Sequence, residues 1–324
     1  MPSRRNRNLA IAAGAVAVGA LAAAAVARRR RAIDPDGEAW PELPEGRPLV
    51  VPSTDGAHLA VSVAGPADGP TVVLAHCWGG LRSFWAAVAR DLVDDGHRVV
   101  VYDQRGHGES TLGDAVLSIE GLGHDLRAVL DAVDAHDAVL VGHSMGGMTI
   151  QSYAAEHPDD FGRRVRGVVL VGTAARTLGR AVPAALVDRF LGDGRAEWTR
   201  RGAVGRRMVR GAIGERAQRG HIDLTLEGFA AVTGQARAGF LVAMAGMDLR
   251  GAGEVMGRVP TRVLVGTRDG LTPPRLGRQL ADGIPGAELE VIPGAGHMLP
   301  LEVPDRIVAA VRSVSGDLAV ASVG

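Results

Sequence analysis

The sequence predicts an α/β fold, with a mostly parallel central sheet, helices on both faces of the sheet and an inserted helical cap. From residue 49 onward, short apolar stretches rich in β-branched residues alternate with helix-like stretches. Repeated alternation of this kind is typical of a parallel sheet that is covered on both faces. The alternation stops at residues 174–257, which are rich in Ala, Arg and Gly and contain no convincing strand. This interruption predicts the cap.

Each element follows from its local pattern of apolar residues. Short apolar stretches predict strands at 49–53, 58–65, 71–76, 98–103, 138–142, 165–172, 260–266 and 287–292. Longer periodic stretches predict helices at 83–95, 119–136, 145–157, after Pro274 and at 303–314. Asp55-Gly56 favours a hairpin between the first two strands. Pro158 is expected to end the helix that begins at 145.

Composition divides the chain into a core and several attached segments. The predicted parts are a hydrophobic segment with basic flanks (1–31), a linker with four prolines (32–48), an α/β core (49–173 and 258–314), a helical cap (174–257) and a tail (315–324). Some of the apolar residues of the cap, which include Trp198, Phe229 and Phe240, are expected to line the substrate pocket.

Charge and cysteine content exclude some classes of function. Residues 1–31 contain seven arginines and no acid, so the remainder holds 29 basic and 36 acidic residues and a net charge of about −7. A body with this charge is not expected to bind nucleic acid. The single cysteine, Cys77, excludes an intrachain disulfide and a cysteine-based metal cluster. The sequence implies no metal and no organic cofactor.

The N-terminal region contains an apolar segment at residues 9–27. Its nineteen residues have no polar side chain, and arginines flank both ends. A helix of this length spans about 28 Å, close to the thickness of a bilayer core. We therefore expect a single membrane anchor and association with a membrane through residues 9–27, in an orientation that the flanking charges do not decide. Two alternatives stay open, a cleaved secretory signal of a secreted protein and a partly ordered tail.

Ser144 lies in a strand-to-helix turn that is typical of a nucleophile. The apolar strand 138–142 leads into Gly142-His143-Ser144-Met145-Gly146, and a helix-like stretch follows. Glycines on both sides let the strand and the helix approach closely, and the serine hydroxyl is then presented at the end of the sheet. A glycine-rich turn with a solvated serine would have the same five-residue pattern. Whether Ser144 is a nucleophile therefore depends on whether the sequence also provides a base and an acid for it.

Two candidate partners follow later strands. A serine nucleophile needs a base and a group that orients the base, and in a parallel sheet these groups belong at the carboxyl ends of strands. Asp269 follows the predicted strand 260–266, and His297 follows the predicted strand 287–292. The order Ser, Asp, His along the chain is typical of a strand-to-helix nucleophile. The sequence therefore predicts Ser144, Asp269 and His297 as catalytic residues.

Acyl transfer also needs hydrogen-bond donors for the oxygen that becomes negative. The backbone N–H of Met145 directly follows the nucleophile. A second donor is expected from the loop after the strand 71–76, and the N–H of Trp78 is our candidate. Met145 and Trp78 are thus the predicted oxyanion hole.

Taken together, these motifs resemble the α/β-hydrolase fold superfamily. His76-Cys77-Trp78-Gly79-Gly80 resembles its oxyanion loop, and the stretch 103–108 resembles its D-x-R-G-x-G turn. The stretch 142–146 resembles its nucleophile elbow, Asp269 its acid and Gly296-His297 its base. The similarity covers about residues 49–314. The elbow is also similar to that of monoacylglycerol lipases and related esterases.

The resemblance carries implications and one departure. Members usually have glycine where Cys77 stands, so a side chain there is expected to narrow the oxyanion loop. Asp103 and Arg105 are interpreted as structural residues that shape the neighbouring loop. Dehalogenases and epoxide hydrolases of this fold have aspartate at the position of Ser144, and the serine therefore argues against both.

The predicted function is hydrolysis of a carboxylic ester, a small-molecule acyl substrate, through an acyl-enzyme on Ser144. An excess of arginine in the cap beside the N-terminal apolar segment suggests the hypothesis of a lipid-like ester, and a solvated helical surface in an arginine-rich chain is the alternative explanation of the same excess. Two alternatives use the same three residues: a cofactor-free perhydrolase of the haloperoxidase type and a carbon–carbon bond hydrolase. A third alternative is a binding member of the fold without catalysis.

Overall fold

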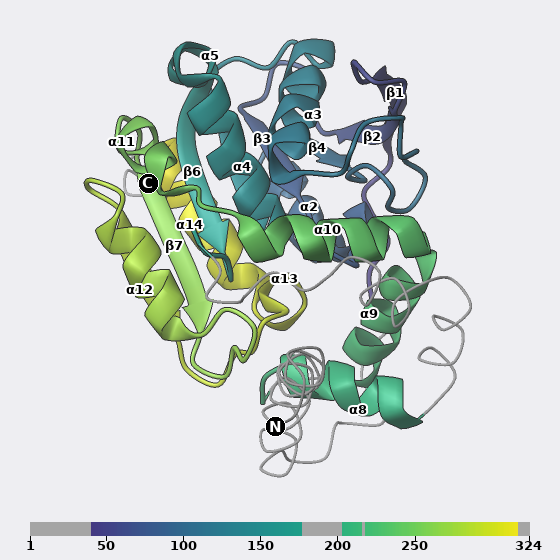
Figure 1. The fold of residues 1–324 in the computed structure, drawn as a ribbon. Helices are drawn as coiled ribbons and strands as arrows, with labels where there is room; N and C mark the ends of the chain where they lie inside the picture. The colour runs from purple at the N-terminus through teal and green to yellow at the C-terminus, as the bar shows by residue number, and fades with distance from the viewer. Residues whose placement is uncertain (1–39, 177–202, 216–217, 317–324) are drawn as a thin grey trace, which may run out of the picture.

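An eight-stranded sheet forms the centre of the molecule (Figure 1). The computed structural model describes residues 40–176, 203–215 and 218–316. The strand order is β1-β2-β4-β3-β5-β6-β7-β8. β1, β2 and β4 pair antiparallel, and every pair from β4 to β8 is parallel. The predicted mostly parallel α/β fold is therefore confirmed.

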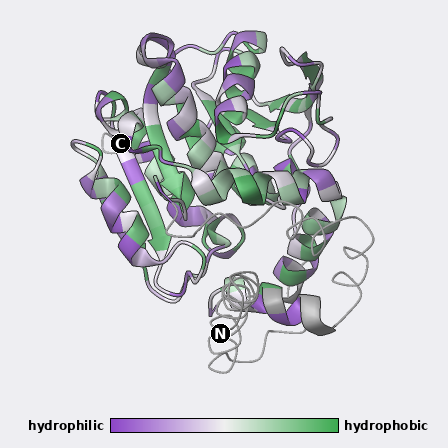
Figure 2. Cartoon of the chain, viewed as in Figure 1, coloured by the Kyte–Doolittle hydropathy of each residue, from purple (hydrophilic) through white to green (hydrophobic). Residues whose placement is uncertain are grey.

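The strands lie within a few residues of their predicted positions. They are β1 (Gly46–Pro52), β2 (His58–Ala64), β3 (Thr71–Ala75), β4 (Arg98–Tyr102), β5 (Ala138–His143), β6 (Val165–Val171), β7 (Thr261–Gly266) and β8 (Glu288–Ile292). β3 and β5 are buried along their whole length, as expected for central strands with helices on both faces. In Figure 2 the strands in front, β6 and β7, are coloured mainly as hydrophobic, whereas the helices carry both hydrophilic and hydrophobic residues.

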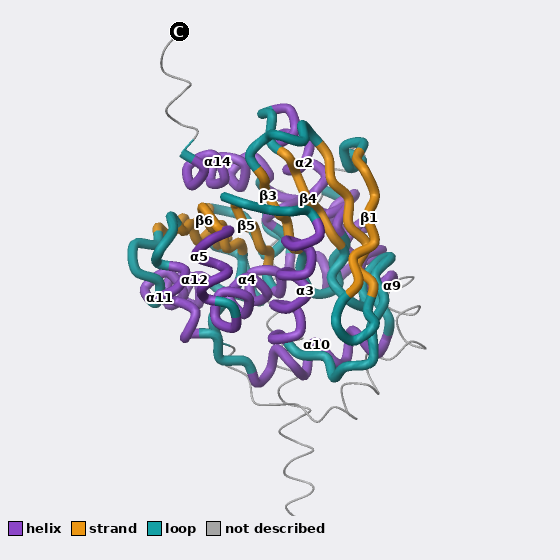
Figure 3. The backbone as a smooth tube through the Cα atoms, turned by 90° about the horizontal axis from the view of Figure 1, so that it is seen from above, coloured by secondary structure: helices purple, strands orange, loops and turns teal. Residues whose placement is uncertain are grey.

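Helices cover both faces of the sheet (Figure 3). One face carries α2 (Ala86–Asp94) and α14 (Pro304–Ser315), whose apolar residues pack in one core cluster with the strands. The other face carries α3 (Ile119–Ala132), α4 (Met145–Glu156), α5 (Pro158–Arg164) and α12 (Pro274–Asp282). Burial of these apolar faces is the main stabilising contribution to the layered arrangement.

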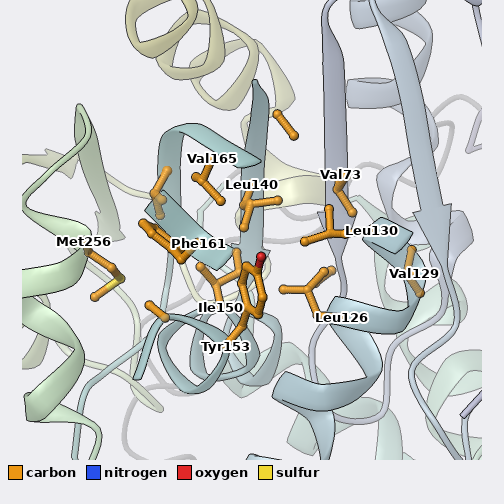
Figure 4. Packing of buried hydrophobic residues seen from close by; sticks show 14 of the residues in the cluster. Val73, Leu126, Val129, Leu130, Leu140, Ile150, Tyr153, Phe161, Val165 and Met256 are labelled. Atoms are coloured by element: carbon orange, nitrogen blue, oxygen red, sulfur yellow. The ribbon is translucent and has the colours of Figure 1, made fainter. Parts of the chain in front are cut away.

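The core beneath α3 and α4 surrounds the strand that leads to Ser144. Leu126 and Leu130 from α3 and Ile150 and Tyr153 from α4 pack against Leu140 of β5 (Figure 4). All five residues are essentially inaccessible to solvent. On the opposite face of the sheet, Val139 and Val141 of β5 are buried in the other core cluster, so close packing on both sides gives the end of this strand a fixed position.

Proline positions account for two differences from the predicted helices. Pro158 does not only end a helix, because it also occupies the first turn of the short helix α5. Proline is well suited to that position, where a backbone N–H has no helical partner. The same applies to Pro300 in the short helix α13 (Leu299–Glu302), which the sequence pattern missed. The predicted helix 83–95 begins as the 3₁₀ turn η1 (Arg82–Trp85) before α2.

The segment between β6 and β7 is helical where it is described. It contains α8 (Ala203–Ala212), α9 (Arg219–Ala231), α10 (Gly234–Gly246), η2 (Arg250–Ala252) and α11 (Gly253–Met256). Residues 177–202 of the predicted cap lie outside the described residues. β6 and β7 run toward the end of the molecule where α8 to α10 lie (Figure 1). The cap helices therefore lie over the carboxyl ends of the parallel strands.

The predicted membrane anchor requires a correction. Over residues 40–176, 203–215 and 218–316, no helix has both the length and the apolar content needed to cross a bilayer. This finding contradicts the prediction of a membrane-anchored protein, and residues 9–27 themselves lie outside the described residues. Eleven of those nineteen residues are alanine. Because each alanine carries a single methyl group, the apolar area of the segment is smaller than its length implied.

Candidate active site

Ser144 occupies a strained turn between β5 and α4. Its backbone angles are φ 51° and ψ −112°, a region that residues with a side chain rarely adopt. The turn is held by two hydrogen bonds: the N–H of Ser144 donates to the carbonyl of Val171 at 2.9 Å, and the Thr173 hydroxyl donates to the carbonyl of Ser144 at 2.7 Å. The strain is thus maintained by neighbouring strands and loops.

The glycines around Ser144 are required by close backbone contacts. A Cβ atom on Gly142 would overlap the backbone of Gly146 and Gly147. A Cβ atom on Gly146 would overlap the carbonyl oxygens of Ala75 and His76. β5, α4 and the end of β3 can therefore approach each other only with glycine at these positions, as the sequence predicted. The predicted oxyanion loop and the predicted nucleophile are brought together by this packing.

His297 and Asp269 form a buried hydrogen-bonded pair. His297 Nδ1 lies 2.9 Å from Asp269 Oδ2, and both side chains are almost inaccessible to solvent. The Asp269 carboxylate also accepts hydrogen bonds from the N–H groups of Leu271 and Thr272 and from the Thr272 hydroxyl. Since the carboxylate is an acceptor only, His297 carries its proton on Nδ1, and its Nε2 is left available as a base.

The surroundings of His297 favour its charged form. Burial lowers the pKa of His297, but the nearby negative charges of Asp269 and Glu302 outweigh it, and the pKa lies above the ordinary value of 6.5. Within the described residues, no hydrogen bond joins the Ser144 hydroxyl to His297. Such bonds are often long in the absence of substrate and shorten when substrate binds.

The loop 76–80, which contains the predicted donor Trp78, is held in place from two sides. Its Gly79 N–H donates to His107 Nε2 at 3.2 Å. The N–H of Gln104 donates to His76 Nε2 at 2.9 Å, which ties the loop to the turn after β4. From the cap, the ring of Phe229 packs edge-on against Trp78 with the centroids 5.4 Å apart. The position of the Trp78 backbone is therefore determined by both the core and the cap.

The Cys77 side chain packs in the hydrophobic core. It is buried in a cluster with Phe84 from η1, Ile213 from the cap, Met298 from the loop after β8 and Leu301 from α13. Burial raises the pKa of this thiol to about 12, so it stays protonated at neutral pH. Cysteine at a position where the family usually has glycine is thus accommodated as a small apolar side chain.

Asp103 and Arg105 hold the turn after β4 in place through hydrogen bonds and ion pairs. The Asp103 carboxylate accepts the N–H groups of Arg82 and Glu109, which fixes the turn after β4. Arg105 pairs with the buried Asp125 of α3 at 2.6 Å and with Asp55 of the β1–β2 hairpin at 2.6 Å. These pairs connect the hairpin, the turn and α3.

Three residues near the site were missed by the sequence analysis. The Thr272 hydroxyl lies 2.8 Å from the carbonyl of Gly172 and 2.7 Å from Asp269 Oδ2. His143 Nε2 donates to the carbonyl of His297 at 2.8 Å. The buried Glu302 carboxylate accepts backbone N–H groups on both sides of His297. Only Glu302 carries a sequence signal, an acid within the apolar run Leu-Pro-Leu-Glu-Val.

The described residues contain no group of three or more His, Cys, Asp and Glu side chains that could hold a metal ion.

Comparison with known proteins agrees with this fold. The model of the alpha/beta hydrolase family matches residues 72–310. A bifunctional esterase/perhydrolase of Acinetobacter calcoaceticus is 34% identical over 110 residues, which are 34% of this chain and 40% of the relative. The chain therefore matches about two fifths of the length of that relative.

Solved structures match over most of the chain. A thermophilic esterase of Thermogutta terrifontis is 29% identical with a TM-score of 0.67, over 82% of this chain and 97% of the esterase. The enol-lactonase of Burkholderia xenovorans is 28% identical with a TM-score of 0.67, over 83% of this chain and 99% of the lactonase.

Proposed function

The chain belongs to the alpha/beta hydrolase family, and from that premise we propose that it hydrolyses a carboxylic ester through an acyl-enzyme on Ser144. The single observation that carries the proposal is the buried His297–Asp269 pair at 2.9 Å, located beside the strained turn at Ser144. A buried carboxylate that orients an imidazole next to a serine at the end of a strand is the arrangement that activates a hydroxyl for acyl transfer.

In the first half of the proposed reaction, the Ser144 hydroxyl attacks the carbonyl carbon of the ester. His297 Nε2 accepts the hydroxyl proton, and Asp269 stabilises the resulting imidazolium through the bond to Nδ1. The tetrahedral intermediate then breaks its bond to the alcohol, which leaves with the proton from His297.

In the second half, water attacks the acyl-enzyme. His297 again accepts a proton, the acid product is released, and Ser144 recovers its hydroxyl. His297 must be neutral to act as a base. Because its pKa is raised above 6.5, we expect kcat/KM to increase with pH through a midpoint above 6.5.

The backbone N–H groups of Met145 and Trp78 are proposed to stabilise the negative oxygen. Met145 is the first residue of α4, and first-turn N–H groups have no helical partner. Within the described residues, neither N–H donates a hydrogen bond to another group. One such donor contributes about 2.7–4 kcal/mol to stabilisation of the transition state.

A chain-length series of aryl esters tests the proposal with the full chain and with Ser144→Ala. Loss of the nucleophile is expected to lower kcat by about 10⁶, by analogy with serine proteases. A fluorophosphonate probe should add its mass at Ser144 in the unchanged chain and not in the variant. The matched control is Ser62→Ala, a change on the distant strand β2, which should leave kcat unchanged. Equal activity of Ser144→Ala and the unchanged chain would refute the proposal.

Perhydrolysis is a second candidate because the relative from Acinetobacter calcoaceticus is named an esterase and a perhydrolase. In this reaction hydrogen peroxide, in place of water, attacks the acyl-enzyme and releases a peracid. Adding peroxide to the aryl-ester assay and measuring the peracid separates the two reactions. Peracid formation that exceeds acid formation would assign the second activity.

A further inference from the structure

The Glu302 carboxylate holds the loop that carries His297 from both sides. It lies at the end of α13, five residues after His297, and is 7% exposed. Glu302 Oε2 accepts the N–H of Gly296 at 2.8 Å, and Oε1 accepts the N–H of Met298 at 3.1 Å. The residues directly before and after His297 are thus bound to one buried side chain.

The same carboxylate also binds the cap. Glu302 Oε2 accepts the N–H of Gly214 at 2.6 Å, and Gly214 lies just after α8. One oxygen atom of Glu302 therefore joins the cap backbone to the His297 loop. Hydrogen bonds from backbone N–H groups to a charged acceptor are stronger than those between neutral groups.

The cap segment 212–215 lies alongside the loop 294–297. The N–H of His297 itself donates to the carbonyl of Ala212 at 2.7 Å. In the opposite direction, the N–H of Glu215 donates to the carbonyl of Gly294 at 2.8 Å. These two bonds and the Glu302 carboxylate form what we call the cap joint, comprising segment 212–215, loop 294–298 and Glu302.

The cap joint needs glycine at position 214. A Cβ atom there would overlap the Glu302 carboxylate, the carbonyl of Gly294 and the N–H of Gly296. The cap therefore contacts the His297 loop through bare backbone at this point. A contact this close leaves little room for the loop to shift without breaking its bonds to the cap.

We propose that Glu302 is a positioning residue, which makes the placement of the base His297 depend on docking of the cap segment 212–215. The inference rests on the proposed function, in which His297 is the base. Glu302 acts in two separable ways. Its hydrogen bonds fix the loop geometry, and its negative charge helps to raise the pKa of His297. The first effect alters kcat, and the second alters the pH profile.

The first test is Glu302→Gln in the full chain. The amide keeps the shape but removes the charge and turns an NH₂ group toward backbone N–H donors. We expect kcat to fall about 10–100-fold, because misplacing a catalytic group by about 1 Å costs about 10²-fold, while KM changes less than about threefold. The acid limb of kcat/KM should move to lower pH. Glu302→Asp, which keeps the charge, should retain an acid limb closer to that of the unchanged chain.

The matched control is Glu290→Gln. Glu290 lies on β8 and pairs with Arg306 at the surface, so this change also removes one charge near the C-terminal part of the chain. It should alter neither kcat nor the acid limb. A role of Glu302 in stability alone would lower Tm and leave the pH profile in place, and that result would overturn the proposal.

The second test approaches the cap joint from the cap. Gly214→Ala changes neither Glu302 nor His297, yet it should lower kcat in the same way. Its control is Gly246→Ala at the end of α10, where an added methyl group would contact nothing within 4 Å. If both changes act through one joint, the double variant should lose less than the product of the two single losses. Independent, multiplying losses, or an unchanged kcat in Gly214→Ala, would overturn the coupling.

A direct NMR titration of His297 separates this inference from the proposed function. The imidazole pKa should be lower in Glu302→Gln than in the unchanged chain, whether or not aryl esters are substrates. If Ser144→Ala keeps full activity, the proposed function fails while the titration still measures the effect of Glu302. If Glu302→Gln does not fold, Gly214→Ala carries the test. An unchanged His297 pKa in folded Glu302→Gln would refute the electrostatic part.

Discussion

The loop 76–80 and the loop 294–298 lie on either side of Ser144, and they are held by opposite kinds of side chain. Neutral histidines hold the first loop in place. His107 accepts the N–H of Gly79, and His76, which belongs to the loop, accepts the N–H of Gln104. Carboxylates bind the second loop, since Asp269 accepts a hydrogen bond from the His297 ring and Glu302 accepts the N–H groups of Gly296 and Met298. The difference matches the charges that the two loops must face in the proposed reaction, an oxyanion on one side and an imidazolium on the other.

The buried histidines show how the two environments act on one type of side chain. Burial lowers the pKa of His76 to about 4 and that of His107 to about 3, and it holds the pKa of His143 well below 6.5. His297 is equally buried, yet its pKa is raised, because Asp269 and Glu302 face it. Burial alone therefore produces a neutral structural histidine, and only the added carboxylates produce a base that can hold a proton.

Replacing one histidine from each environment should give the largest contrast. His297→Gln removes the proposed base, and we expect kcat to fall by about 10⁶. His107→Gln disturbs the hydrogen bonds of this ring to Gly79 and Arg105 and its packing against His76 and Phe240. These contacts support the loop and take no part in the proposed proton transfer, so kcat should fall by about 10² or less. The kcat of both variants is measured with aryl esters at a pH above the acid limb of the unchanged chain. Equal losses would show that His297 is no more than a structural residue.

Asp269→Asn should have the next largest effect. Loss of this carboxylate removes the preference for the Nδ1–H tautomer, and the corresponding change in a serine protease lowers kcat by about 10⁴. The sign of the pH effect follows from the raised pKa. Because Asp269 raises the pKa of His297, its removal lowers that pKa, and the residual activity should persist to lower pH.

The control for this change is Asp282→Asn, an exposed position at the end of α12. It removes one negative charge from the same region of the chain and should leave both kcat and the acid limb unaltered. An acid limb that stays in place in Asp269→Asn would mean that this limb reports a group other than His297.

The sequence predicted the parts of the site that follow a rule about strand ends. Asp269 and His297 lie in the loops that follow β7 and β8, and the carboxyl ends of parallel strands meet at one edge of a sheet. The Gly-x-Ser-x-Gly turn at 142–146 follows the same rule. Local patterns were sufficient here because each residue needs only its own strand to bring it to the site.

The cap joint could not be predicted in this way. Gly214 and Glu302 are 88 residues apart, and their contact depends on how the cap docks, for which no local periodicity exists. The same limit applies to His107 and Gly79, which meet only through the packing of two loops. The apolar composition of residues 9–27 predicted a membrane anchor, and that prediction is contradicted because no helix in the described part of the chain can cross a bilayer.

Cys77 should give the smallest effect, and it sharpens the description of the 76–80 loop. Its side chain packs with Phe84, Ile213 and Met298 in the core, so Cys77→Ala should lower the free energy of unfolding by about 1 kcal/mol and change kcat less than about threefold. In the folded chain the thiol should resist modification, because burial holds its pKa at about 12. Chemical denaturation, aryl-ester turnover and thiol titration measure these three properties.

A tenfold increase of kcat in Cys77→Gly, the residue usual at this position in the family, would instead mean that the side chain narrows the oxyanion loop. The loop 76–80 would then limit catalysis through the Cys77 side chain, in addition to positioning the Trp78 N–H.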